Sequence, residues 1–517
     1  MGQIPSSDAP TGTTNPTEAT KLLKKPPPPD LPYLRTPLRA WSAVVAVSVA
    51  ASFAQLPLMA WQTLQPVMLS DNVLCGASDA TVDLDRIYNI GLGLAAVCNL
   101  FYGLMFDIIG PRALGLYGLT GTLVGFAVMA FSLQIPCAAP STVLLWVSSL
   151  VTFIAAPATA LAANCYMYLL SDDAYLVSAI TNCNYVVASS YGLIIGTLNS
   201  SYGAHSYTFF YLMACCNVLA VVGIAYLIPT RSDFQALQQV EMAKQKAKAE
   251  GGKEGGSGGS KGDKLLRDDG SGGGSGELAA APAPSALQYI AQQLSDAYTL
   301  CFRTSTLGLG GLLLVIHIFV LYMQQTLFLI EQYSYYQSLF GAATGQALQN
   351  AYSMIFTFFG LPVSLGYGAI ADRAPSWATI AMWDATSLLF FACSILPFIG
   401  AQYASMLFLT ALANVYYLVC PPLIMLYSPS ELFGTLFGLL QAVIGILQIM
   451  LVYVEDAAFA ALMPGDGREA GRVVMKLILW TALLFVFALA NQWAWRTKPP
   501  PALGTVTMEV VYSAKRG

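Results

Sequence analysis

Charged residues are scarce in this sequence. Only 10% of its 517 residues are Asp, Glu, Lys or Arg, whereas 56% are hydrophobic. Soluble globular domains carry about 25% charged residues, so this composition excludes a water-soluble protein. Apolar runs of about 20 residues, the length that a helix needs to cross a membrane, recur along the whole chain. The sequence therefore predicts a polytopic membrane protein.

The sequence patterns of catalysis are also missing. The chain has no Gly-rich phosphate-binding loop, no nucleophile elbow and no cluster of metal-ligand residues. Its first forty residues are rich in Pro, Thr and Lys and have neither the apolar core nor the cleavage site of a signal peptide. We therefore expect no enzyme activity, no cofactor and no metal, and membrane lipid rather than nucleic acid as a partner.

Most of the ten cysteines lie inside apolar runs, where a small hydrophobic side chain explains them. Cys75 and Cys137 differ, because both fall in short polar connections on the non-cytosolic side of the topology derived below. A disulfide between these two residues is a hypothesis that an oxidising compartment would permit.

Twelve spans account for the apolar segments. We expect them near 41–69, 87–106, 114–133, 143–170, 178–198, 207–229, 306–329, 346–371, 377–397, 402–427, 433–454 and 472–496. The chain then divides into a disordered tail (1–40), a six-helix half (41–229), a linker (230–305), a second six-helix half (306–496) and a C-terminal tail (497–517). The Gly/Ser-rich middle of the linker cannot pack a core, and its end predicts either a helix along the membrane surface or an extension of the seventh span.

The positive charges orient these spans. Of the 24 Lys and Arg residues, this topology places only Arg86, Arg468, Arg472 and Lys476 on the outer side. Without the eight basic residues of the linker, twelve still lie inside against four outside. The positive-inside rule therefore predicts that both tails and the linker are cytosolic.

Two polar loops interrupt the apolar segments in a related way. Gly103 to Arg112 follows the second span, and Gly368 to Pro375 follows the eighth. Asp107 and Asp372 are 265 positions apart, as are Pro157 and Pro422. This shared offset predicts two parallel repeats, an arrangement in which substrate binds at the midplane between the halves.

The two loops resemble the signature that joins spans two and three in the major facilitator superfamily. The resemblance covers all twelve spans and implies an all-α membrane protein of two pseudo-symmetric six-helix halves. It assigns a gating role, holding the cytosolic side closed, to Gly103, Asp107, Gly110, Arg112, Gly368, Asp372 and Arg373. The chain departs from the pattern at Ile108, where the family prefers a basic residue, and at Pro111, which displaces the positive charge to Arg112.

Within the superfamily, the first loop, the long linker and the neutral membrane interior resemble the system-L-type facilitative amino-acid transporters. They are also similar to the related amino-acid transporters of apicomplexan parasites. This resemblance implies uniport or exchange of neutral or cationic amino acids by rocker-switch alternating access.

Polar side chains on one face of the cavity-lining spans are the candidates for substrate binding, because polar groups in a bilayer are costly. They are Gln55, Gln62, Asn182, Tyr185, Ser189, His317, Tyr322, Gln325, Asn414 and Tyr417. Gln441 and Gln448 repeat the seven-residue spacing in the eleventh span. Each such residue has an alternative role, which is to bridge one helix to another. His317 is the candidate for pH sensitivity, and Asp384 is expected to be a structural group.

The central part of the cavity-lining spans has no carboxylate, which favours a facilitator over a proton symporter. A facilitator of sugars or nucleosides, and a nutrient sensor that does not transport, are the alternatives. We expect a monomer in the plasma membrane. The alternative is a vacuolar or lysosomal membrane, since Glu18 to Leu23 has the spacing of an acidic dileucine signal, a match that chance also explains.

Overall fold

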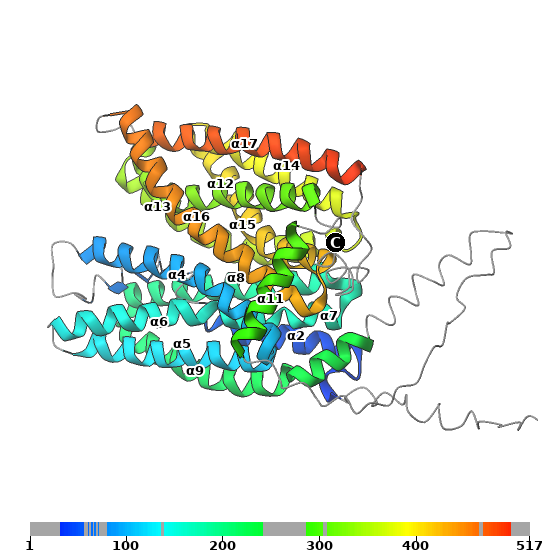
Figure 1. The fold of residues 1–517 in the computed structure, drawn as a ribbon. Coiled ribbons are helices and arrows are strands. Elements are labelled where there is room, and N and C mark those ends of the chain that lie inside the picture. Colours follow the sequence, from blue (N-terminus) through cyan, green and yellow to red (C-terminus); the bar gives the residue numbers. More distant parts are fainter. Residues whose placement is uncertain are drawn as a thin grey trace, which may run out of the picture.

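The computed structural model describes residues 31–55, 80–135, 139–240, 286–302, 308–464 and 469–497, together with 60–61, 64–65, 67–68 and 71. The regular elements in this part of the chain are helices, and the long ones run side by side (Figure 1). Of the predicted residues, Gln62, Cys75 and Cys137 lie outside the described part.

The helices form two groups that follow the two halves of the sequence. The first group contains α2 (Pro37–Ser52), α4 (Ala80–Ile109), α5 (Pro111–Gln134), α6 (Ala139–Ala163), α7 (Cys165–Leu169), α8 (Ala174–Tyr202) and α9 (Ser206–Leu227), with the 3-10 turns η1 (Pro32–Leu34) and η2 (Ser171–Asp173). The second contains α12 (Gly308–Phe340), α13 (Ala342–Ala371), α14 (Ser376–Ser394), α15 (Ile399–Tyr427), α16 (Phe433–Leu462) and α17 (Glu469–Thr497), with the 3-10 turn η3 (Ser430–Leu432). Helix α11 (Ala286–Phe302) precedes the second group.

Local chemistry explains several helix boundaries. Thr36 caps α2 by accepting a hydrogen bond from the backbone N–H of Arg39 at 3.3 Å, and Pro37 suits the first turn because it needs no donor. Between α4 and α5, Gly110 adopts a φ of 92°, a conformation that favours glycine, and Pro111 then begins α5. The first polar loop, Gly103 to Arg112, therefore contains a tight turn between two antiparallel helices.

Seven described helices are long and apolar enough to cross a membrane. An eighth span results if the segments Leu313–Leu329 and Glu331–Phe340, which are bent by 52°, count as one. Helix α2 and the first part of α16 are shorter apolar helices. A helix nevertheless overlaps each of the twelve predicted spans. Twelve crossings and cytosolic ends therefore stay predictions.

The two halves meet mainly along three helix pairs, α4 with α16 and α8 with both α13 and α15. Figure 1 shows the first group below, the second group above, and α4 and α16 facing each other between them. A Cβ added at Gly103 of α4 would lie only 1.9 Å from the carbonyl oxygen of Gly434 in α16. The backbones of the two halves thus touch directly here, which only glycine permits.

Helix α11 crosses the long helices steeply in Figure 1 and is not collinear with α12 in that view. Its Ala297 and Leu300 are buried against Leu432 and Leu436, at the beginning of α16. Other apolar residues of this helix, such as Leu287, are exposed on the protein surface. A position of α11 along the membrane surface stays a prediction.

Candidate functional site

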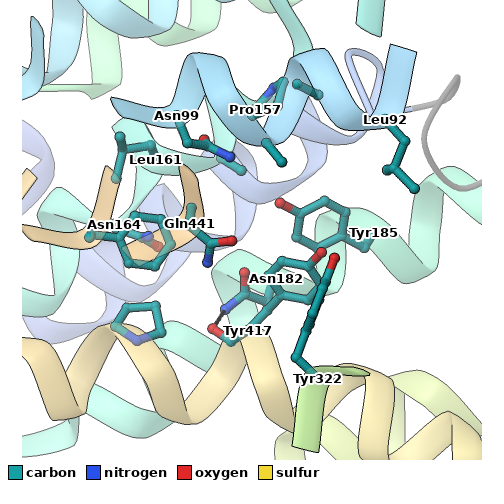
Figure 2. A pocket seen from close by; sticks show the side chains of 15 residues that line it. Leu92, Asn99, Pro157, Leu161, Asn164, Asn182, Tyr185, Tyr322, Tyr417 and Gln441 are labelled. Atoms are coloured by element: carbon teal, nitrogen blue, oxygen red, sulfur yellow. Dashed lines mark hydrogen bonds between the residues drawn. The ribbon is translucent and has the colours of Figure 1, made fainter. Parts of the chain in front are cut away.

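A cavity lies between the two halves (Figure 2). Helices α4, α6 and α8 line it from the first half, and α12, α15 and α16 from the second. Its polar side chains are Asn99, Asn164, Asn182, Tyr185, Tyr322, Tyr417 and Gln441. Among the described residues that line it, none is Asp, Glu, Lys, Arg or His. The volume of about 60 Å³ has room for only a few water molecules, so the lining side chains of the two halves approach each other closely here.

A proline creates one polar contact across this cavity. Pro421 has no backbone N–H, so the carbonyl oxygen of Tyr417, four residues earlier in α15, has no helical donor at that position. Asn182 of α8 donates to this oxygen through Nδ2, and the hydroxyl of Ser178 donates to it at 3.3 Å. The unpaired carbonyl thereby becomes a hydrogen-bonded link between the two halves.

Tyrosines form an aromatic wall of the cavity. The ring centroids of Tyr185 and Tyr417 are 4.7 Å apart, and those of Tyr322 and Tyr416 are 4.6 Å apart. Tyr416 also contacts Tyr417 edge-on, with centroids at 4.9 Å. Such packing holds the rings in place while their hydroxyl ends remain available for hydrogen bonds. The cavity therefore combines apolar ring surface with neutral donors and acceptors.

Two carboxylates hold the halves together away from the cavity. Asp107 at the end of α4 accepts hydrogen bonds from the backbone N–H groups of Gly434 at 3.0 Å and Thr435 at 2.7 Å, and from the Thr435 hydroxyl at 2.7 Å. Asp372 after α13 accepts from the backbone N–H groups of Tyr175 and Leu176, each at 2.9 Å. We call these contacts the first and the second latch.

The latches are related by the internal repeat. In each, the donors are the second and third residues of a helix in the opposite half, α16 for Asp107 and α8 for Asp372. The first turn of a helix presents unpaired N–H groups and a partial positive charge, which favour a carboxylate. Partial burial raises the pKa of the Asp372 carboxyl, against the backbone donors, which lower it.

Of the other residues of the two loops, the arginines bond carbonyl groups of their own half, whereas Gly368 packs against the opposite half. Arg112 donates through Nε to the carbonyl oxygen of Ile228 at 2.6 Å, and Arg373 donates to that of Ala369 at 2.7 Å. A Cβ at Gly110 would lie 2.7 Å from Cβ of Arg231. At Gly368 it would lie 2.8 Å from Cβ of Ala179, across the α8 and α13 contact.

Comparison with known proteins rests on structure alone, because no protein-family model and no curated protein matches the chain. The human organic anion transporter MFSD10 superposes with a TM-score of 0.54 at 12% identity, covering 88% of this chain and 100% of that one. The proton:xylose symporter XylE, a major facilitator superfamily protein bound to 6-bromo-6-deoxy-D-glucose, superposes with a TM-score of 0.60 at 10% identity, covering 92% and 98%. The chain has the major facilitator fold. With its apolar helices, this fold makes it an integral membrane protein.

Four of the predicted substrate-binding residues meet in the cavity of this major facilitator fold, namely Asn182, Tyr185, Tyr322 and Tyr417. Three others are placed elsewhere. Gln55 is fully buried and donates to the carbonyl oxygen of Ala156 and to the hydroxyl of Thr159 in α6. Asn414 donates to the carbonyl oxygen of Thr410 in its own helix, and Gln325 is buried without lining the cavity.

Ser189 contributes to the interface between the halves rather than to the cavity. Its hydroxyl lies 3.1 Å from that of Thr357, which belongs to α13. Since α8 and α13 also carry the second latch, Ser189 extends the same helix contact by a side-chain hydrogen bond.

His317 is fully buried inside the second half. Its Nε2 lies 2.6 Å from Oδ1 of Asp384 in α14, and its Nδ1 lies 2.7 Å from the amide of Asn491 in α17. Seven residues further along α12, Gln324 bonds Ser387 of α14 and Thr481 of α17. These polar contacts tie α12 to its neighbours, and His317 does not line the cavity.

Sequence reasoning did not select Asn99, Asn164 or Gln441, which line the cavity. The signal was present, because each is an amide within an apolar span. Gln441 was distinguished only by its spacing from Gln448. These amides face the cavity because of the orientation of each helix about its axis. That orientation depends on packing against other helices, and no local sequence pattern predicts it.

Proposed function

We propose that this protein is a facilitative transporter of amino acids without net charge, which works by rocking its two halves around the central cavity. The observation that carries this proposal is the cavity itself. It lies between the halves and is lined by amides and phenols, with no ionisable group other than tyrosine among the described lining residues. Such a site suits a small polar solute whose own charges cancel.

The neutral lining bears on both substrate and coupling. A cationic substrate buried there would lack a carboxylate partner, and a buried unpaired charge is costly. A proton symporter would need a titratable group that faces the solute, whereas His317 and Asp384 bond each other outside the cavity. The lining therefore favours zwitterionic amino acids over cationic ones, and uniport or exchange over proton coupling.

The latches support alternating access. Each latch joins the C-terminal end of a helix in one half to the first turn of a helix in the other half. Both lie on the side of the membrane that the positive-inside rule assigns to the cytosol. We infer that the conformation shown is closed toward the cytosol. Opening to that side would require both carboxylates to leave their helix ends, and this exchange of partners would limit the rate.

A sugar facilitator is the second candidate. Two features favour it: the tyrosine rings, which can stack on the apolar face of a sugar, and the amides, which can bond its hydroxyls. XylE, which shares the fold, is described as a proton:xylose symporter. We also propose that the protein is a monomer in the plasma membrane. The proposed segments of the chain are 1–40, 41–229, 230–305, 306–496 and 497–517.

Flux through purified protein in liposomes tests these proposals. The panel would contain labelled neutral and cationic amino acids, hexoses and nucleosides, with and without a pH gradient, against protein-free liposomes. We expect uptake of neutral amino acids that equilibrates without accumulation and is stimulated by the same amino acid inside. Uptake of hexose alone would establish the second candidate, and accumulation driven by the pH gradient would refute facilitation.

A further inference from the structure

Gln441 presents an unused polar group to the cavity. This residue of α16 is 7% exposed, and its Nε2 has no hydrogen-bond partner among the described residues. The buried hydroxyl of Tyr416 likewise makes no hydrogen bond of ordinary geometry, and it is the polar side-chain group that Gln441 contacts. A buried donor without an acceptor costs about 1–3 kcal/mol, and most buried polar groups are paired. Since the contact with Tyr416 falls short of ordinary hydrogen-bond geometry, the amide of Gln441 can exchange it for a ligand and turn its NH2 group toward that ligand.

Asn182 presents the opposite chemistry from the other half. Its Nδ2 donates to the carbonyl oxygen and the hydroxyl of Ser178, at 2.8 and 3.2 Å, and to the carbonyl oxygen of Tyr417. These acceptors fix the orientation of the amide, because a flipped Oδ1 would face oxygen atoms. Oδ1 is then left as an acceptor at the cavity. In Figure 2 the amides of Asn182 and Gln441 face the same space.

We infer that Asn182 and Gln441 form a two-point binding site for the charged groups of an α-amino acid. Oδ1 of Asn182 accepts a hydrogen bond from the α-ammonium, and Nε2 of Gln441 donates to the α-carboxylate. An α-amino acid carries this donor and this acceptor on one carbon, whereas a sugar carries hydroxyls that serve as either. The inference rests on the proposed function and names the atoms that would select its substrate.

This pairing also links recognition to movement. Asn182 belongs to the first half and Gln441 to the second, so a ligand bound to both bridges the halves. A bound amino acid therefore stabilises the closed arrangement around the cavity, and a solute that lacks either group does not. Transport of amino acids should then depend on both groups of the ligand together, while the side chain meets the tyrosine wall.

The test combines variants with substrate analogues. Labelled L-leucine uptake into liposomes would be measured for the wild type, Gln441→Leu, Asn182→Ala and the matched control Gln332→Leu. Gln332 is a fully buried amide of α12 outside the cavity, bonded to the hydroxyl of Tyr336 at 3.0 Å. L-Leucine methyl ester, which lacks the carboxylate, and N-acetyl-L-leucine, which lacks the ammonium, would serve as competitors.

We expect Gln441→Leu to raise KM for L-leucine about tenfold or more, since hydrogen bonds to charged groups are among the stronger ones. Its inhibition by the methyl ester should stay as in the wild type. Asn182→Ala should raise KM similarly and leave inhibition by N-acetyl-L-leucine unchanged. Gln441→Glu keeps the shape of the side chain and adds a negative charge near the carboxylate of the ligand. It should therefore raise KM for L-leucine more than Gln441→Leu does.

Two results would overturn the inference. If the wild type transports L-leucine and the cavity variants raise KM no more than Gln332→Leu does, the two-point site is refuted while the proposed function stands. If Gln441→Leu weakens the binding of L-leucine and of its methyl ester equally, Gln441 does not bind the carboxylate. Transport of hexose with no amino-acid transport would refute the proposed function, and the inference with it. Thermal unfolding of each variant shows whether it folds, and Gln441→Glu keeps the test decisive should Gln441→Leu not fold.

Discussion

Asp107 and Thr435, 328 positions apart in the chain, are joined by two hydrogen bonds of 2.7 Å, from the backbone N–H and the hydroxyl of Thr435 to one carboxylate oxygen. The second latch has no such hydroxyl among the described residues, because Asp372 is held by the backbone N–H groups of Tyr175 and Leu176. The internal repeat therefore produces two latches of the same geometry and unequal strength.

Replacement of Asp107 by Asn should weaken the first latch. Asn has one acceptor oxygen, and its NH2 group would face a donor, so at least one hydrogen bond to a charged group is lost at a cost of about 1.5–3 kcal/mol. We expect the maximal transport rate to change about tenfold while the ratio of KM values for two substrates stays constant.

Rates at saturating concentration of two substrates measure this effect. Asp372→Asn is the matched variant and should have the smaller effect, because its latch has fewer donors. An altered substrate preference in Asp107→Asn would show that this residue contributes to selection, contrary to the position of the latch outside the cavity.

Gly103 makes the closed state possible by its lack of a side chain. A Cβ there would lie 1.9 Å from the carbonyl oxygen of Gly434, a backbone atom that cannot move without its helix. Gly103→Ala should therefore force α4 and α16 apart and reduce transport more than tenfold, since one misfit at a helix contact of this kind costs more than about 1.4 kcal/mol.

The matched control is Gly366→Ala in α13, where an added Cβ meets nothing within 4 Å. Transport by this variant should equal that of the wild type. Labelling of cysteines introduced near the first latch would report the opening directly. Wild-type transport by Gly103→Ala would mean that the halves can close without backbone contact at this position.

The latches show how far sequence reasoning reaches. The resemblance of the two loops to the family signature singled out Asp107, and its carboxylate bonds the start of a helix in the other half. The identity of that helix could not be predicted, because the partner lies 327 positions away and no local signal marks it. The signature specifies the chemistry of the contact, whereas packing selects its partner.

Helix α12 shows a different limit. His317 and Gln324 are seven positions apart and share a face of α12, and that face bonds α14 and α17. Tyr322, between them in sequence, faces the cavity instead. Periodicity determines which residues share a face. The direction of that face depends on the rotation of the helix, which the surrounding helices determine.

The pair of His317 and Asp384 should contribute stability rather than substrate selectivity. Removing one partner of a buried hydrogen-bonded pair costs about 1–3 kcal/mol or more, because the other group remains buried without its partner. Asp384→Leu should therefore lower the temperature of thermal unfolding markedly, and the double variant with His317→Leu should lower it less. KM ratios between substrates should not change in folded protein.

A pH profile of transport by His317→Ala that matches the wild type would exclude His317 as a pH sensor.

Pro421 should influence substrate binding through a carbonyl that it leaves free. Pro421→Ala restores a backbone N–H opposite the carbonyl oxygen of Tyr417, which then competes with Nδ2 of Asn182 for this acceptor. A neutral hydrogen bond contributes about 0.5–1.5 kcal/mol, so loosening the amide of Asn182 should raise KM about two- to tenfold.

The neighbouring Pro422→Ala is the matched control for this prediction. It restores an N–H opposite the carbonyl of Leu418, which accepts no side-chain hydrogen bond within the described part of the chain. Both variants remove a proline from the interior of α15, but only the change at position 421 disturbs the contact between the halves. KM values for one transported substrate, measured on both variants, decide the question. Equal shifts would attribute the effect to the shape of α15, whereas a shift confined to Pro421→Ala would attribute it to the link between Tyr417 and Asn182.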